Sequence, residues 1–415
     1  MAQSINELIQ DKMFKFAIKL EQFNQPTQRQ IQAMLDTLVD DLRKQLEAAA
    51  PGDQIPSRKR RRMEALIKQA RATIRRQYGA IWPVHQQSLD KLAAVTERGT
   101  TQVFNEAFTF EVAEPTLTPQ ELQALSRDPI VLGQHAQEWW EGQSQARQQA
   151  YASQMRVGIA AGETNDELVN RIIGKPTGKR VAARNEDGSI KRRRNGKAVM
   201  ISEREGGVMD MGKREATALV RTSAQTVSND TMMRTYAENQ AILKGVAALV
   251  TLDGRTTKIC MGRSGAIWDP RTGDPLPEST RQEGFPGPPP WHWQCRTVLT
   301  PVTKSWDELR AEAAAKSVAD KDGVKRKRPP LSKERRDKLD TVPKVKRQSM
   351  DGEVPGGHTY ESWLRSKDES FQKAQLGKAR FDLWKDGKIT IAQLTDFSGR
   401  DLTVAELREL AGEDK

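Results

Sequence analysis

The stretch that decides the fold is PPPWHWQCRTVLTPV, residues 288–302. It gathers three prolines, two tryptophans, His292 and Cys295 in a loop, and it then continues into RTVLTPV, which is typical of a β-strand. Two other short segments also predict strands, GVAALVTL (245–252) and GAIWD (265–269), and loops rich in Pro and Gly separate all three. Together these segments predict a compact α+β unit.

Most of the remaining chain shows the apolar spacing of helices. Apolar residues recur every three or four positions over 5–23 and again over 31–46. Pro26 lies between the two stripes, so we expect it to end the first helix and to make an antiparallel helical hairpin. Further helices are predicted over 63–82 and 129–161, over 212–239, and in the C-terminal segment.

The segment 175–210 departs from this helical pattern. Its dipeptides Asp187-Gly188 and Asn195-Gly196 are typical of two-residue hairpin turns between short β-capable runs. The predicted fold class is therefore α+β, mainly α, with long helices and helical hairpins, a small α+β domain and a basic β-hairpin insert.

The length and these patterns predict four regions. They are an N-terminal helical region over 1–128, a domain over 129–302 that carries the insert 175–210, a helix with a basic linker over 303–357, and a C-terminal helical segment over 358–415.

The charge of the chain indicates a polyanionic partner. The formal net charge is +12, and only 36% of the residues are hydrophobic. Nucleic acid is the first candidate, and a generally soluble basic surface is the alternative. The candidate DNA phosphate contacts are the densest basic runs, Arg58, Lys59, Arg60, Arg61 and Arg62, and Lys191, Arg192, Arg193 and Arg194.

Cysteine content and hydropathy bear on the compartment. Two cysteines in 415 residues exclude a disulfide framework and favour a reducing cytosol. We expect no secretory signal peptide at the N-terminus and no membrane-spanning helix, since no run approaches the roughly 18 apolar residues that such a helix needs.

Polar residues of the α+β unit concentrate in TLDGRTTKIC (251–260) and PPPWHWQCRT (288–297). His292 and Cys295 are three residues apart, a usable spacing for metal ligands, and Cys260 could join them. A structural zinc site normally has four ligands, so Asp253 or a water would have to complete it. A disulfide between the two cysteines is a further alternative, which the reducing compartment disfavours.

A structural clasp without catalysis explains the same residues. In this interpretation the prolines stiffen an extended loop and the Trp rings pack. His292 bonds to Asp253, and Arg255 or Arg296 pairs with that carboxylate. The predicted clasp consists of Asp253, Arg255, Thr256, Cys260, His292, Cys295 and Arg296. A catalytic zinc would need a nearby general base, and the sequence contains no H-x-E pair.

The combination of these motifs resembles the phage head-morphogenesis family, the minor head proteins of the phage Mu F type. The shared pattern is an Arg-Thr helix, then Asp-x-Arg-Thr with a Cys, an aromatic strand, and Pro-Pro-x-His-x-x-Cys-Arg. The matching residues are Arg221, Thr222, Asp253, Arg255, Thr256, Cys260, Trp268, Pro289, Pro290, His292, Cys295 and Arg296. The resemblance covers roughly 138–302, and the C-terminal segment is also similar to tails of such proteins.

The resemblance implies a minor capsid protein without catalytic activity, located in the phage head near the portal and in the host cytoplasm during assembly. The implied partners are the portal protein, major capsid or scaffold proteins, and packaged double-stranded DNA. The only cofactor to consider is a structural zinc at Cys260, His292 and Cys295. Two alternatives remain: a zinc-dependent nuclease or hydrolase centred on those three residues, and a generic DNA-binding or scaffolding protein.

Overall fold

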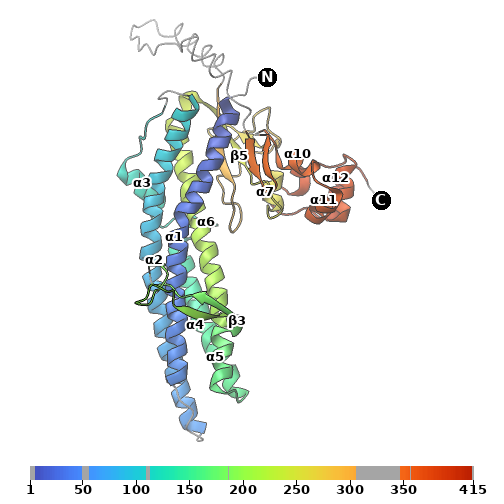
Figure 1. The fold of residues 1–415 in the computed structure, drawn as a ribbon. Helices are drawn as coiled ribbons and strands as arrows, with labels where there is room; N and C mark the ends of the chain where they lie inside the picture. The colour runs from blue at the N-terminus through green and yellow to red at the C-terminus, as the bar shows by residue number, and fades with distance from the viewer. Residues whose placement is uncertain are drawn as a thin grey trace, which may run out of the picture. The chain divides into compact units, whose positions relative to one another are not determined.

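A computed structural model describes residues 5–48, 56–108, 113–185, 187–304, 346–355 and 357–413 (Figure 1). The chain divides into two compact units. We call Met1–Lys19, Val95–Thr118 and Ser228–Lys415 the clasp unit, and Leu20–Ala94 with Pro119–Val227 the arm unit. The structure is mainly helical with small antiparallel sheets, which confirms the predicted fold class.

The helices are α1 Ile5–Ala48, α2 Pro56–Phe108, α3 Pro119–Ser126, α4 Ala136–Ala160, α5 Asn165–Ile173, α6 Val208–Glu238, α7 Lys258–Gly262, α10 Tyr360–Arg365, α11 Glu369–Leu376, α12 Lys378–Lys385 and α13 Val404–Leu410. Two short 3-10 helices are η1 Gln240–Ile242 and η2 Ile391–Leu394. The strands are β1 Ile130–Val131, β2 Gln134–His135, β3 Lys175–Ala182, β4 Met200–Glu205, β5 Leu243–Leu249, β6 Ile267–Trp268, β7 Val298–Thr303, β8 Lys346–Ser349 and β9 Gly352–Pro355.

The helical hairpin predicted around Pro26 is wrong, because α1 continues through this proline as one helix. A proline inside a helix costs about 3 kcal/mol, since it removes one hydrogen bond and crowds the preceding turn. Leu20 and Ile31 on either side of it are both buried, so burial of the apolar stripe outweighs this cost. Thr27, which directly follows this proline, shares a 2.7 Å hydrogen bond with Ser88 of α2.

Other helix boundaries follow local signals. α5 begins with a capping box between Thr164 and Glu167, and α13 begins with one between Thr403 and Glu406, which is the Thr-x-x-Glu pattern typical of a helix start. The helix predicted from residue 129 starts only at Ala136, because the β1–β2 hairpin occupies the preceding residues.

The arm unit has a continuous apolar core between its helices. The stripes of α1 and α2 face those of α4, α5 and α6, as the helical spacing requires. The core includes Ile31, Leu35, Leu38, Leu42, Ile67, Ala70, Ile74, Ile81, Trp140, Tyr151, Met155, Leu168, Ile172, Leu219 and Val220. From this unit β3 and β4 extend as an antiparallel pair, which forms the basic insert that the turn signals predicted.

The clasp unit contains the predicted α+β sheet, in the strand order β6-β5-β7, all antiparallel. β7 is buried along its whole length, and β5 along most of it. A second apolar cluster joins Leu252 and Met261 to the C-terminal helices, through Tyr360, Trp363, Phe381 and Trp384 among others. Most of the helix and basic linker predicted over 303–357 lies outside the described residues, whereas the end of this region forms the β8–β9 hairpin.

Candidate metal centre and basic arm

Two loops of the clasp unit bring the candidate ligands together. The first leaves β5 and turns into α7, which carries the buried Cys260. The second turns tightly just before β7, where the Cys295 N–H donates to the His292 carbonyl at 3.2 Å and Gln294 has a φ of 58°. Since β5 and β7 are neighbours in the sheet, their flanking loops meet at one end of it.

Cys260, His292 and Cys295 form a group that could bind a metal. Their ligand atoms all lie within 4.8 Å of one another. The two Sγ atoms are 3.7 Å apart, and the Nε2 atom of His292 lies 3.1 Å from the Cys260 Sγ. Two thiolates on a tetrahedral zinc, each at ~2.3 Å from the ion, would be about 3.8 Å apart. The spacing of the two sulfur atoms therefore fits such a site.

Hydrogen bonds orient the histidine ring and the two thiols of the cluster. The Nδ1 atom of His292 lies 2.8 Å from the Trp293 carbonyl, so this nitrogen carries the proton and Nε2 keeps its lone pair toward the sulfur atoms. The hydrogen bond between the two thiols raises the pKa of Cys260 and lowers that of Cys295. Burial lowers the pKa of His292, but its contact with Cys295 raises it above the usual value.

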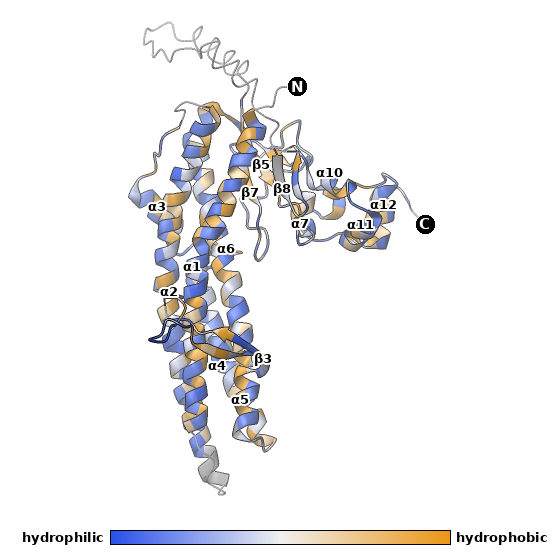
Figure 2. Ribbon diagram, viewed as in Figure 1, coloured by the Kyte–Doolittle hydropathy of each residue, from blue (hydrophilic) through white to orange (hydrophobic). Residues whose placement is uncertain are grey.

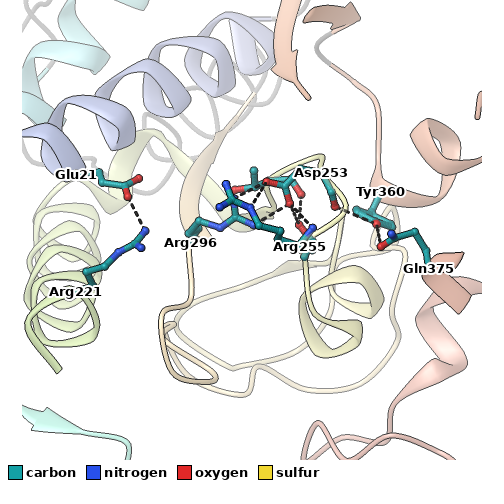
Figure 3. A network of polar contacts seen from close by, with 9 residues as sticks. Glu21, Arg221, Asp253, Arg255, Arg296, Tyr360 and Gln375 are labelled. Carbon is teal, nitrogen blue, oxygen red and sulfur yellow. Dashed lines mark hydrogen bonds and ion pairs between the residues drawn. The ribbon is translucent and has the colours of Figure 1, made fainter. Parts of the chain in front are cut away.

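A carboxylate network holds the first loop in place (Figure 3). Arg296 donates to both oxygens of Asp253, at 2.5 and 2.8 Å, and the Arg255 backbone N–H donates to Oδ1 at 3.0 Å. The Thr256 hydroxyl donates to the Thr251 carbonyl at 2.6 Å and lies 3.1 Å from the same Oδ1. Burial raises the pKa of Asp253, yet Arg296 holds it below the ordinary value.

The structure corrects three details of the predicted clasp. His292 bonds to Thr257 at 2.9 Å rather than to Asp253, because its ring faces α7. Arg296 makes the bidentate pair, whereas the Arg255 side chain is 86% exposed with its Nε 4.0 Å from the carboxylate. The loop turns instead of staying extended, so Trp291 packs under Arg263 while Trp293 remains exposed.

Several residues at the site were not predicted. The hydroxyl of Thr297 donates to the Cys260 Sγ at 3.2 Å, and that of Thr257 meets the candidate ligand His292. Arg263 is buried, and this burial lowers its pKa to about 10. The two threonines lie two or three residues from a candidate ligand, and this proximity was the available sequence signal. The spacing of candidate metal ligands involves only Cys and His and therefore does not identify the threonines.

The C-terminal segment also supports the site from outside the predicted motif. The Tyr360 backbone N–H donates to the Ser264 hydroxyl at 2.8 Å, and its own hydroxyl donates to the Asp253 carbonyl at 3.2 Å. Figure 3 shows Tyr360 and Gln375 approaching the Asp253 loop. No spacing pattern in the sequence links these residues, because the contact depends on packing between segments more than a hundred residues apart.

The second candidate site is the basic insert, residues 175–205, which projects from the arm unit and which we call the basic arm. Beyond β3 and β4 it branches into two short hairpins, marked by the bridges Arg184–Ile190 and Arg192–Ala198. In each hairpin the first arginine closes the turn by donating to a glycine carbonyl, at 2.8 Å to Gly188 and at 2.8 Å to Gly196. The arm therefore holds its shape largely through its own backbone and turn contacts.

The cations of the arm face solvent. Lys191, Arg192, Arg193, Arg194 and Lys197 are all exposed, and none of these five has a carboxylate within 4.0 Å among the described residues. Figure 2 draws the loop of the arm as hydrophilic. Of the other basic run, Arg61 and Arg62 are exposed on α2, whereas the side chains of Arg58, Lys59 and Arg60 lie outside the described residues.

No protein-family model, no curated protein and no solved structure matches the chain. Within the part of the chain that the structure describes, no helix is both long enough and apolar enough to cross a membrane.

Proposed function

We propose that the chain is a minor head protein of a tailed phage, with a structural role in head assembly. The observation that carries this proposal is the assembly of the family-like motif into one clasp. Asp253 pairs with Arg296, and Cys260 lies against His292 and Cys295, although 35 residues separate the two cysteines. The resembling residues thus form one spatial unit, which supports a shared structural device rather than scattered coincidences.

The proposed role of the cluster is to hold a structural zinc. Two thiolates and one imidazole are ligands that zinc prefers, and their spacing fits a tetrahedral ion. When bound, the ion would join the α7 loop to the loop before β7. Elemental analysis of the purified full chain should find one zinc per chain, and Cys295→Ser should lose it. Absence of metal from freshly purified wild-type protein would reject the zinc.

A non-enzymatic role is favoured over the hydrolase alternative by how Asp253 is used. This carboxylate is the acid of the clasp, and Arg296, Thr256 and the Arg255 backbone occupy its oxygens. It is therefore poorly placed to act as a general base. Metal-dependent DNA cleavage by the wild-type protein that disappears in His292→Ala would instead establish the nuclease.

The proposed partner of the basic arm is double-stranded DNA. Residues 175–205 contain ten Lys and Arg against four Asp and Glu, a net charge of +6 and half of the +12 of the whole chain. Exposed cations on hairpin tips can neutralise phosphates without reading bases, so the affinity should depend strongly on salt.

Charge neutralisation tests the arm. Replacing Lys191, Arg192, Arg193 and Arg194 by Ser should weaken DNA binding and reduce the slope of log K against log salt by about 3.6 if each contacts one phosphate. The matched control replaces four cations that the structure pairs with carboxylates, namely Arg43, Arg156, Lys213 and Arg214, and so removes the same charge. An equal loss in both variants would show a general charge effect and reject the arm as the DNA site.

Association with the portal is the decisive test of the head-protein proposal. Co-expression with the portal protein of its phage should yield a complex that survives size-exclusion chromatography, and the chain should be found in purified heads. A protein that binds DNA but neither associates with the portal ring nor enters heads would favour the generic DNA-binding alternative.

A further inference from the structure

We infer that a metal held by Cys260, His292 and Cys295 keeps its fourth coordination position open, occupied by a water that exchanges with small anions and imidazole. This inference rests on the proposed metal clasp and goes beyond it. A structural zinc site is normally closed by four protein ligands. Among the described residues, no fourth Cys, His, Asp or Glu atom joins the three.

The carboxylate of the clasp, Asp253, already binds other groups and is therefore not available as the fourth ligand. Asp253 receives two hydrogen bonds from Arg296 and one from the Arg255 backbone. To reach the metal it would have to give up its bidentate partner, whose side chain is only 24% exposed. Removing one member of such a pair leaves a poorly solvated charge, so the carboxylate is held away from the ligand set.

The exposure of the surrounding side chains indicates which side of a bound metal would face solvent. Cys260 and Cys295 lie on the buried side, where the buried Thr297 hydroxyl donates to the Cys260 Sγ. His292 is half-buried and Thr257 is exposed, and they meet at 2.9 Å at the edge of the cluster that solvent reaches. The remaining ligand position therefore lies toward the Thr257 hydroxyl and solvent, where water can enter.

Thr257 is suited to hold this ligand without binding the metal itself. Its hydroxyl lies 2.9 Å from Nε2, so a metal on Nε2 would take over that lone pair and free the hydroxyl for a neighbouring water or anion. A neutral hydroxyl is a weak ligand compared with thiolate or imidazole. Thr257 is therefore a positioning residue for the fourth ligand.

The electrostatics allow an anion at this position. A divalent metal with two thiolates and one neutral imidazole carries no net charge. The buried cation Arg263, held over the Trp291 ring at 4.5 Å, acts electrostatically on both cysteines. With no net negative charge on the metal group and a cation near its thiolates, a small anion such as azide would not be repelled from the fourth position.

Cobalt substitution tests the open position on the full chain. We would remove the native metal, load Co²⁺, and record thiolate-to-cobalt charge transfer together with the visible bands that report coordination. Azide and imidazole should each shift the visible bands in a saturable way while the charge transfer persists, because the water leaves and both thiolates stay. Visible bands that do not respond to either ligand would show a closed site and overturn the inference.

Two further outcomes separate this inference from the proposed clasp. Absence of any thiolate-to-cobalt band would reject the metal clasp itself. A loss of charge transfer on adding azide would show that the anion strips the metal, which overturns the open position but leaves metal binding intact.

Two matched variants test the positioning role. Thr257→Val should keep cobalt and its charge transfer but change the azide affinity several-fold. Thr272→Val makes the same substitution at an exposed threonine outside the ligand cluster and should leave the azide affinity within twofold. Equal effects of the two substitutions would overturn the role of Thr257, because only it faces the proposed position.

Discussion

The clasp loops and the basic arm both connect or extend the regular elements of the fold, and different interactions stabilise them. The clasp loops, within residues 250–297, partly bury a carboxylate–guanidinium pair and fully bury two cysteines, and each of these groups has a specific partner. The arm, within 175–205, is exposed and held largely by its own turns. A polar group that is removed from water needs a hydrogen-bonding partner in the protein, whereas an exposed cation is solvated by water and needs none. The clasp therefore depends on its internal partners, whereas most cations of the arm remain exposed to solvent.

The largest effect should come from breaking the metal clasp. We expect Cys295→Ser to destabilise the metal-loaded protein by about 5 kcal/mol or more, because structural metal binding contributes directly to folding. Urea unfolding followed by hydrogen exchange should place the loss in the clasp unit and leave the arm unit protected. After chelation, wild type and variant should have the same stability; a persisting large difference would mean that the thiol, rather than a metal, carries the effect.

A matched pair of arginines separates partnered from solvent-exposed charge within the clasp. Arg296→Met leaves the Asp253 carboxylate, only 14% exposed, without its bidentate partner, and should cost about 3 kcal/mol. Arg255→Met removes a side chain that is 86% exposed and should cost under about 0.5 kcal/mol. Chemical denaturation measures both. Equal costs would contradict the assignment of Arg296 as the clasp partner.

Acid should lower the stability of the arm unit because this unit contains His85, the one fully buried histidine among the described residues. Burial lowers the pKa of His85 from 6.5 to about 3, and its Nδ1 accepts from the Trp140 indole at 3.0 Å. Between these pH values the unfolded chain binds a proton that the folded chain does not. Stability should therefore fall as pH drops below 6.5, by about 1.4 kcal/mol per unit, until about pH 3.

Urea unfolding at pH 7 and pH 5, with arm-unit amides as the probe, measures this loss. His85→Gln keeps a hydrogen-bond acceptor but cannot titrate, so its stability should change less over the same pH interval. If the wild type and this variant lose stability equally, other groups cause the acid sensitivity of the arm unit.

The smallest effect concerns how the arm is held. Gly188 and Gly196 both have positive φ, so alanine at either should cost about 1 kcal/mol in local strain. Only at Gly188 would the added Cβ meet α1, 2.9 Å from the Gln30 nitrogen, whereas nothing lies within 4 Å at Gly196. Faster hydrogen exchange of the arm in Gly188→Ala than in Gly196→Ala would confirm that the first hairpin lies against α1. Identical exchange would show that the arm is independent of it.

Local sequence signals predicted the strands beside the clasp and the hairpins of the basic arm well. Turn dipeptides identified the two hairpins of the arm, and the strand-like runs identified β5, β6 and β7. The same kind of reasoning failed at Pro26, where burial on both sides outweighs the cost of a proline in a helix. It also could not choose between Arg255 and Arg296, because both lie near Asp253 in any plausible loop.

The sequence alone determined which chemistry is available: two cysteines and a histidine at ligand spacing, one acid with two nearby arginines, and basic runs bounded by turn residues. Only the tertiary structure decided which of these groups meet. It set the two sulfur atoms 3.7 Å apart, assigned His292 to Thr257, and placed Tyr360 of the C-terminal segment against the Asp253 loop. Residue types and turns are properties of a few neighbouring positions, whereas these contacts depend on how distant apolar surfaces pack.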